Sequence, residues 1–205
     1  MALIQIDDVS IVRAGREVVS HFSAAIASGK ITAIIGPNGC GKTSLLSALA
    51  GDIPIDGGTI TIDGKKLIEI STQEQAKIRS VVQQNRNYWL SYTAREVIEM
   101  GQDEEALQQV DRIMSALQIN GFANQKVTTL SGGEAQRIEI ARALIRNTDI
   151  YLLDEPLSAQ DSNSKQRIIS LLSELRSHGK TIVIIAHIDK DALTWCDQVI
   201  DTLSK

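Results

Sequence analysis

The sequence predicts an α/β fold in which helices flank a mainly parallel β-sheet. Two observations lead to this prediction. A glycine-rich loop, GPNGCGKT, joins the apolar run ITAII to a run of helical composition. Further along the chain, apolar runs alternate with helical ones in the order DIYLLD, KQRIISLLSELRS and TIVIIAH. Strands and helices that alternate in this way form a parallel sheet with helices on both faces.

The N-terminal part indicates additional β-structure, which we expect to be antiparallel. LIQIDDVSIV alternates partly and predicts a strand, and ITAII predicts a buried strand that ends near Ile35. IPIDGGTITIDGKKL predicts strands joined by turns at 56–58 and 63–64, because Asp-Gly pairs favour tight turns. KTSLLSALAG predicts a helix that stops at Gly51.

A small helical subdomain is predicted over about 86–128. Thr93 to Glu96 fits a capping box that opens a helix. The stretch DEEALQQVDRIMSALQ collects apolar side chains on one predicted helical face, namely Leu107, Val110, Ile113, Met114 and Leu117. With 205 residues the chain suits one domain. We therefore expect a single domain over 1–205, with its α/β core at about 1–85 and 129–205.

Composition restricts the class of protein. A net charge of -4 and a pI of about 5.4 argue against nucleic-acid binding through a broad basic face. The N-terminus, MALIQIDDVS, lacks the basic region of a signal peptide, and no apolar run approaches the ~20 residues that span a bilayer. Cys40 and Cys196 lie far apart and indicate free thiols in a reducing compartment. We expect a cytoplasmic protein that reaches a membrane only through a partner.

The glycine-rich loop predicts a nucleoside triphosphate site. Gly36, Gly41, Lys42 and Thr43 match G-x-x-x-x-G-K-[ST], between a predicted strand and a predicted helix. Glycines let backbone N–H groups approach phosphate, and the following helix dipole adds to the positive field. Lys42 is expected to reach the β- and γ-phosphates, and the Thr43 hydroxyl to bind Mg²⁺. The predicted nucleotide-binding residues of this loop are Gly36, Pro37, Asn38, Gly39, Cys40, Gly41, Lys42, Thr43 and Ser44.

Two carboxylates follow the predicted strand DIYLLD. Asp154 is expected to hold Mg²⁺, and Glu155 to orient or activate water. Taken alone, the pair fits a solvated acidic turn before Pro156 better. Together with the glycine-rich loop, at the spacing expected of parallel strands, the pair favours the functional interpretation.

LSGGE is followed by AQRIEIARAL, and with these residues the chain resembles the ABC (ATP-binding cassette) ATPases, which are P-loop NTPases. The resemblance covers nearly the whole chain. The stretch is similar to the family's signature motif and opens a helix, which suits an anion. The resemblance implies that two cassettes pair head to tail, so that each signature covers the partner's γ-phosphate. The predicted signature residues are Leu130, Ser131, Gly132, Gly133 and Glu134.

Other stretches resemble further elements of this family. In VVQQN, Gln84 takes the place of the glutamine that contacts Mg²⁺ and the attacking water, with Gln83 as an alternative. SAQD, residues 158–161, resembles the D-loop along the dimer seam, and His187 resembles the switch histidine that binds the γ-phosphate. Where the family usually stacks an aromatic ring on adenine, this chain has Arg13 or its neighbour Ala14, and the guanidinium of Arg13 can stack on a base. The resemblance thus implies catalysis by Glu155, His187, Gln84 and Lys42, and Mg²⁺ held by Thr43, Gln84 and Asp154.

Three stretches resemble most the iron-siderophore and haem uptake ATPases: GPNGCGKTSLL, VTTLSGGEAQR and GKTIVIIAHIDKDALTWCDQVI. The resemblance implies an ATP- and Mg²⁺-dependent subunit that energises a membrane transporter. Its implied partners are a second cassette in a homodimer, integral membrane permease subunits on the inner face of the cell membrane, and an extracytoplasmic substrate-binding protein, with no nucleic acid. Two alternatives remain open, a haem-exporter-type cassette of cytochrome c maturation and a soluble Fe–S assembly ATPase. Tyr88, Trp89 and Tyr92 fit a permease-docking surface and a cap on the core equally well.

Overall fold

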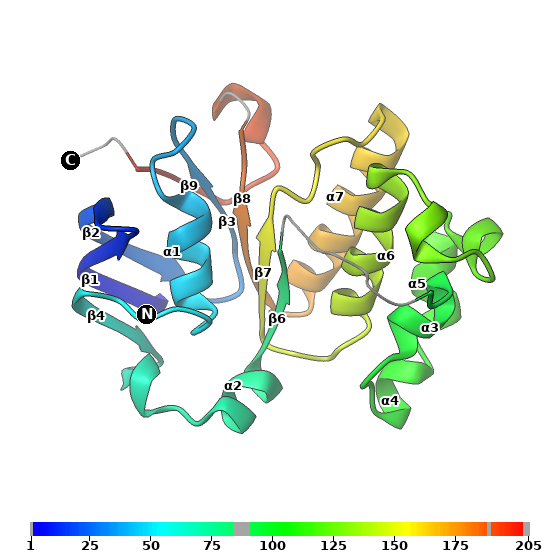
Figure 1. Ribbon diagram of the computed structural model, residues 1–205, viewed down its shortest axis with the longest axis horizontal. Coiled ribbons are helices and arrows are strands. Elements are labelled where there is room, and N and C mark those ends of the chain that lie inside the picture. The colour runs from blue at the N-terminus through cyan, green and yellow to red at the C-terminus, as the bar shows by residue number, and fades with distance from the viewer. Residues whose placement is uncertain (1, 84–90, 188–189, 203–205) are drawn as a thin grey trace.

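The computed structural model describes residues 2–83, 91–187 and 190–202, and it contains two β-sheets (Figure 1). The antiparallel sheet has the strand order β2-β1-β4-β5. Its strands are β1 (Ala2–Arg13), β2 (Arg16–Ala27), β4 (Gly57–Ile62) and β5 (Lys65–Lys66). The expected antiparallel β part at the N-terminus is therefore confirmed.

The second sheet is parallel throughout and has the order β6-β7-β8-β3-β9. Its strands are β3 (Ile31–Ile35), β6 (Arg79–Val82), β7 (Ile150–Asp154), β8 (Thr181–Ile185) and β9 (Gln198–Asp201). Every residue of β7 and β8 is buried, as expected of parallel strands covered on both faces. The expected parallel sheet is confirmed.

Helices cover the two faces of the parallel sheet. Helix α1 (Lys42–Leu49) lies between it and the antiparallel sheet, while α6 (Gly132–Leu144) and α7 (Ser162–Ser177) cover the opposite face (Figure 1). Successive side chains of β7 therefore enter different cores. Leu152 packs in the cluster that contains Leu45 of α1, and Leu153 packs in the cluster that contains Leu172 of α7. Apolar burial on both faces fixes the position of the strand ends.

Between β6 and α6, short helices lie within residues 94–129. They are α3 (Ala94–Glu99), α4 (Glu104–Leu107), α5 (Val110–Ala116), η2 (Asn120–Phe122) and η3 (Val127–Thr129). The capping box at Thr93 is present: its hydroxyl accepts from the Glu96 N–H, and its own N–H donates to the Glu96 carboxylate. The expectation of one amphipathic helix with Leu107 on its buried face was wrong. The helix breaks between α4 and α5 at 108–109, and Leu107 is turned outward to 42% exposure. The other four apolar residues are buried in the core, namely Val110, Ile113, Met114 and Leu117.

Two further local features differ from the expectations. Residues 53–55 form no strand, because Pro54 lacks the N–H that a strand ladder needs. Helix α2 (Thr72–Ile78) and β6 lie in a stretch to which the sequence assigned no element. After β8 the chain forms a 3-10 turn, η4 (Lys190–Leu193). Within the described residues, the helices are too short or too polar to cross a lipid bilayer.

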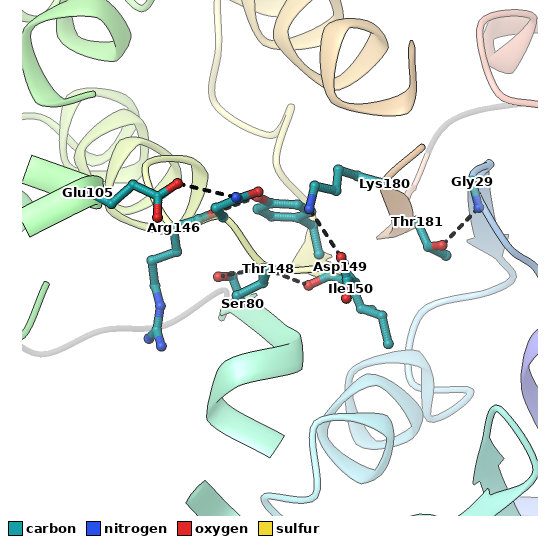
Figure 2. Close-up of polar contacts among 11 residues, drawn as sticks. Gly29, Ser80, Glu105, Arg146, Thr148, Asp149, Ile150, Lys180 and Thr181 are labelled. Atoms are coloured by element: carbon teal, nitrogen blue, oxygen red, sulfur yellow. Dashed lines mark hydrogen bonds and ion pairs between the residues drawn. The ribbon is translucent and has the colours of Figure 1, made fainter. Parts of the chain in front are cut away.

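Polar contacts close one edge of the parallel sheet, where β7 and β8 begin (Figure 2). Lys180 Nζ lies 3.1 Å from Asp149 Oδ1, and the Gly29 N–H donates to Thr181 Oγ1 at 2.9 Å. Thr148 Oγ1 donates to Ser80 Oγ at 3.1 Å. These groups thus bond to one another at the amino edge of the sheet. The opposite, carboxyl edge is where parallel α/β sheets bind ligands.

Candidate active site

A cleft of about 610 Å³ opens at the carboxyl edge of the parallel sheet. The loop after β3 and the start of α1 form one wall, and the ends of β7 and β8 supply two further side chains. The cleft is lined by Val18, Asn38, Gly39, Gly41, Lys42, Thr43, Ser44, Glu155 and His187. The structure thus brings together the glycine-rich loop and two of the expected catalytic residues, which are separated by more than a hundred positions in the sequence.

The loop requires glycine where it passes β2. Gly41 has a φ of 88°, in the left-handed region, and caps α1. A Cβ on Gly41 would lie 2.3 Å from the backbone oxygen of Val18 and 2.7 Å from Val19 Cγ2. Both the backbone conformation and the close approach therefore exclude a side chain. The result is a bare backbone at the start of α1, where N–H groups can approach an anion.

Lys42 points back into the loop. Its Nζ donates to the carbonyl oxygens of Gly36 and Pro37, at 2.8 Å each, and the residue is 4% exposed. Cys40 packs beside it, with Sγ 3.8 Å from Nζ and 3.2 Å from Thr202 Oγ1. An ammonium group buried on two neutral carbonyls has no compensating negative charge from them. Phosphate oxygens at this position would provide that charge.

Asp154 ends β7 and is 1% exposed. Its Oδ1 is buried with no hydrogen-bond partner. Burial raises the pKa of this carboxyl above its ordinary value, and hydrogen bonding with the Thr43 side chain partly opposes the rise. A buried carboxylate oxygen beside a hydroxyl fits a divalent cation, because such ions take hard oxygen ligands.

Mg²⁺ commonly rests on one or two protein oxygens plus substrate phosphates and water. In the part of the chain that the structure describes, no cluster of three His, Cys, Asp or Glu side chains could hold a metal unaided. The Thr43 hydroxyl and the buried Asp154 carboxylate are oxygen ligands of the kind that Mg²⁺ takes. Gln84, the third expected ligand, lies outside the described residues, as do Tyr88 and Trp89.

Glu155 faces His187 across the cleft. Its Oε1 lies 2.5 Å from His187 Nε2. The Glu155 backbone has a φ of 49°, and its N–H donates to the Ile185 carbonyl, so that the residue turns out of β7 toward the end of β8. Its own carbonyl accepts from Gln136 Nε2 at 2.7 Å. The carboxylate is thereby held at the cleft with the imidazole as its partner.

The LSGGE stretch lies outside this cleft. Ser131 caps α6 through a capping box in which its hydroxyl donates to Glu134 Oε2 at 2.7 Å and the Glu134 N–H donates to Ser131 Oγ at 3.3 Å. The hydrogen bonds from Ser131 lower the pKa of Glu134. Within the described residues, none of the five signature positions lines the cleft. The chain's own signature therefore does not complete the site.

Arg13, the residue expected to contact adenine, is not among the residues that line the cleft. Arg13 donates to the carbonyl oxygens of Val12 at 3.0 Å and of Pro54 at 3.5 Å, and it does not line the cleft. Val18 of β2 lines it instead. Sequence analysis missed Val18, because an apolar residue within a strand carries no signal for a ligand. The alternative glutamine, Gln83, donates to Asp52 Oδ2 at 2.8 Å.

Comparison with known proteins agrees with this geometry. The ABC transporter family model matches residues 19–158. The hemin import ATP-binding protein HmuV of Rhodococcus jostii is 32% identical over 203 residues, which cover 95% of this chain and 69% of that protein. The petrobactin import ATP-binding protein YclP of Bacillus subtilis is 32% identical over 207 residues, which cover 97% of this chain and 82% of that protein.

Solved structures share the fold. The structure of a bacterial Atm1-family ABC exporter with ATP bound superposes with a TM-score of 0.85 at 28% identity, over 97% of this chain and 37% of that one. A dimeric ATP-binding cassette in a post-hydrolysis state, bound to ADP and Pi, superposes with a TM-score of 0.81 at 27% identity, over 97% and 93%. The chain therefore belongs to the ABC transporter family, as one of its ATP-binding cassette ATPases.

Proposed function

We propose that this chain is the ATP-hydrolysing subunit of a membrane importer for an iron chelate, such as hemin or a siderophore. One observation carries the catalytic part of this proposal. The ends of β7 and β8 place Glu155 and His187 in contact at the cleft that Lys42 and Thr43 line. The names of the relatives support the cargo, since they describe hemin and petrobactin import.

The roles of the binding residues follow from their contacts. The loop from Gly36 to Ser44 binds the phosphates through its backbone N–H groups. Lys42 exchanges the two carbonyls it now contacts for β- and γ-phosphate oxygens. Thr43, Asp154 and Gln84 would hold Mg²⁺, which would supply positive charge that offsets the phosphate oxygens. Arg13 would contact the base from outside the set of residues that line the cleft.

Hydrolysis would take place beside the Glu155–His187 contact. A water oxygen bonds to the γ-phosphorus, the bond from that phosphorus to the β–γ bridging oxygen breaks, and ADP leaves. The Glu155 carboxylate accepts the water's proton. The Oε1 atom of that carboxylate contacts His187 Nε2, and the imidazole would in turn donate to the γ-phosphate.

A second copy of the chain would complete the site. The N-terminus of α6, with Ser131 and Gly133, lies outside this cleft. In a head-to-tail homodimer, the partner's Ser131 and the partner's Gly133 cover the γ-phosphate, where their N–H groups stabilise developing charge. Two identical sites then form at one interface.

The membrane partners follow from the relatives. An importer places this cassette on the cytoplasmic face of the cell membrane, against permease subunits that receive cargo from an extracytoplasmic binding protein. Export is a second candidate, because the cassette of an Atm1-family exporter has the same fold at 28% identity. Tyr92, which is 37% exposed next to the expected permease-facing stretch, is a candidate contact.

Co-purification and uptake test the proposal together. The protein is isolated from gently detergent-solubilised cells, and its partners are identified by mass spectrometry. Uptake of labelled hemin and of a ferric siderophore is then measured in cells whose only copy carries Glu155→Gln, with Glu69→Gln as the matched exposed control. We expect a stoichiometric polytopic membrane protein, and loss of uptake of one chelate only with Glu155→Gln. Soluble partners alone, or unchanged uptake of both chelates, would contradict import.

A further inference from the structure

Thr202 follows the last strand of the parallel sheet and lies against the glycine-rich loop. Strand β9 pairs with β3, with Asp201 opposite Ile35, and the Thr202 N–H continues this pairing by donating to the Ile35 carbonyl at 3.0 Å. Ile35 is the residue that precedes the loop. In the sheet, β9 lies on the side of β3 away from β8 (Figure 1). The end of β9 therefore fixes the entry to the loop from the side opposite to His187.

The Thr202 hydroxyl extends this contact into the loop itself. Its Oγ1 lies 3.2 Å from Cys40 Sγ, within hydrogen-bond distance of the sulfur. Gly36 has a φ of 152°, and a Cβ on it would overlap Thr202 Oγ1 and lie 3.0 Å from Cys40 Sγ. The first glycine of the loop thus leaves the space that the hydroxyl fills. Thr202 consequently touches the loop at two points, Gly36 and Cys40.

The Cys40 sulfur also contacts the lysine of the loop. Lys42 Nζ donates to Cys40 Sγ at 3.8 Å, and it donates to the Gly36 and Pro37 carbonyls at 2.8 Å each. An ammonium group has no acceptor, so the sulfur accepts in its contact with Lys42. Within the described residues, neither Cys40 nor Thr202 lines the cleft. Any effect of Thr202 on a nucleotide therefore passes through the shape of the loop.

Nucleotide binding would change which contacts hold the loop. In the proposed function, Lys42 exchanges the Gly36 and Pro37 carbonyls for phosphate oxygens, and its two short contacts across the loop are lost. The contact between Thr202 and Cys40 involves no group that binds phosphate, so it can persist. Resting on that proposed function, we propose that Thr202 is a positioning residue that holds the loop in its phosphate-binding shape once Lys42 has turned to the nucleotide. A loop that is already ordered binds its ligand at a lower entropic cost.

Nucleotide titration and steady-state hydrolysis test this inference with paired variants. Thr202→Ala removes the hydroxyl, and Thr202→Ser keeps the hydroxyl without the methyl group. Cys40→Ala removes the other partner of the same contact, and it decides the matter if Thr202→Ala does not fold. Thr59→Ala is the matched control, because Thr59 is also half-buried and lies on β4 of the other sheet. The Kd for ADP with Mg²⁺ is measured by calorimetry, and kcat and KM for ATP are measured by phosphate release.

We expect the Kd for ADP to rise by about 3- to 10-fold in Thr202→Ala and in Cys40→Ala, the usual effect of one lost hydrogen bond. Thr202→Ser should stay within about 2-fold of the wild type, because it keeps the hydroxyl. KM for ATP should rise with the Kd, while kcat at saturating ATP changes by less than about 2-fold. The double variant should bind no more weakly than the weaker single variant, because both substitutions remove one contact. A merely structural role would lower kcat together with affinity, and the losses of the single variants would add.

Three results would contradict the inference. Wild-type ADP affinity in both Thr202→Ala and Cys40→Ala would overturn it, and so would Thr202→Ser that binds as weakly as Thr202→Ala. Lys42→Ala separates these results from a failure of the proposed function. If Lys42→Ala weakens ADP binding and Thr202→Ala does not, the phosphate site stands and only the role of Thr202 falls. If Lys42→Ala binds ADP as tightly as the wild type, the proposed phosphate site is wrong and the role of Thr202 falls with it.

Discussion

Nε2 of His187 lies 2.5 Å from Oε1 of Glu155, so the proposed base and the proposed γ-phosphate sensor are in contact. The two residues come from the ends of β7 and β8, which are neighbours in the sheet. Substitution of His187 and substitution of Glu155 should therefore have different effects on ATP hydrolysis and on dimer formation.

His187→Ala should keep ATP binding and lose hydrolysis. We expect kcat to fall by about 10²–10³-fold, the usual cost of one lost transition-state contact, while ATP affinity changes little because Lys42 and Thr43 remain. The measurement is phosphate release at saturating ATP. His178→Ala, at the end of α7, is the matched control. Full activity of His187→Ala would remove His187 from the catalytic set.

Glu155→Gln should bind ATP, hydrolyse it very slowly and accumulate as a dimer. The amide keeps the shape of the side chain and cannot accept the water's proton, so the sandwiched nucleotide persists. Size-exclusion chromatography with light scattering, in the presence of ATP and Mg²⁺, measures the dimer. Glu69→Gln provides the exposed control. A monomeric profile for Glu155→Gln under these conditions would count against the head-to-tail dimer.

Asp154→Asn should stabilise the nucleotide-free protein at neutral pH. An acid whose folded-state pKa is raised holds its proton more tightly when folded. Its destabilising effect is therefore absent below the ordinary value of 3.8 and grows as pH rises through the raised pKa. Removing the charge should raise the free energy of unfolding by about 1 kcal/mol, or Tm by about 2–4 °C.

Thermal melts with a chelator at pH 7 measure this effect, with Asp63→Asn in an exposed turn as the control. With ATP and Mg²⁺ the order should reverse, because only the wild-type carboxylate can hold the metal. An Asp154→Asn variant that is less stable than the wild type without nucleotide would contradict the cost of burying the carboxylate. A variant that gains as much stability from Mg²⁺ and ATP as the wild type would contradict the metal assignment.

Glu134→Gln should remove a pH-dependent part of the stability of α6. Hydrogen bonds from the Ser131 side chain and backbone lower the pKa of Glu134. The stabilisation is present above the ordinary value of 4.5 and is lost as pH falls through the lowered pKa. Because the group is exposed to solvent, we expect less than about 1 kcal/mol. Unfolding by urea between pH 3 and 7 measures the difference, which should shrink toward acidic pH.

Arg13→Ala should weaken nucleotide binding less than Lys42→Ala does. The Arg13 side chain donates to the Val12 and Pro54 carbonyls and does not line the cleft, whereas Lys42 lies within the loop. We expect a change in the Kd for ATP of about 3-fold or less for Arg13→Ala and of at least about 10-fold for Lys42→Ala. Titration measures both. Identical affinity in the wild type and Arg13→Ala would exclude Arg13 from the site.

The sequence by itself determined the family and the local chemistry of the site. The loop from Gly36 to Thr43 and the pair Asp154–Glu155 are contiguous motifs, in which spacing along the chain sets the geometry. Capping boxes at Thr93 and Ser131 are local as well, because a cap and its partner are three residues apart. The parallel sheet followed from the alternation of strands and helices alone.

Tertiary structure decided which side chains meet across these elements. Arg13 lies against Pro54 instead of in the cleft, Val18 takes a place at the cleft, and Leu107 turns outward at a helix break. Gln160 Nε2 donates to Gln136 Oε1, although the two residues are 24 positions apart. This hydrogen bond forms because α6 lies beside the segment that follows β7. Such contacts arise from packing between distant parts of the chain, and periodicity or spacing along the sequence carries no record of them.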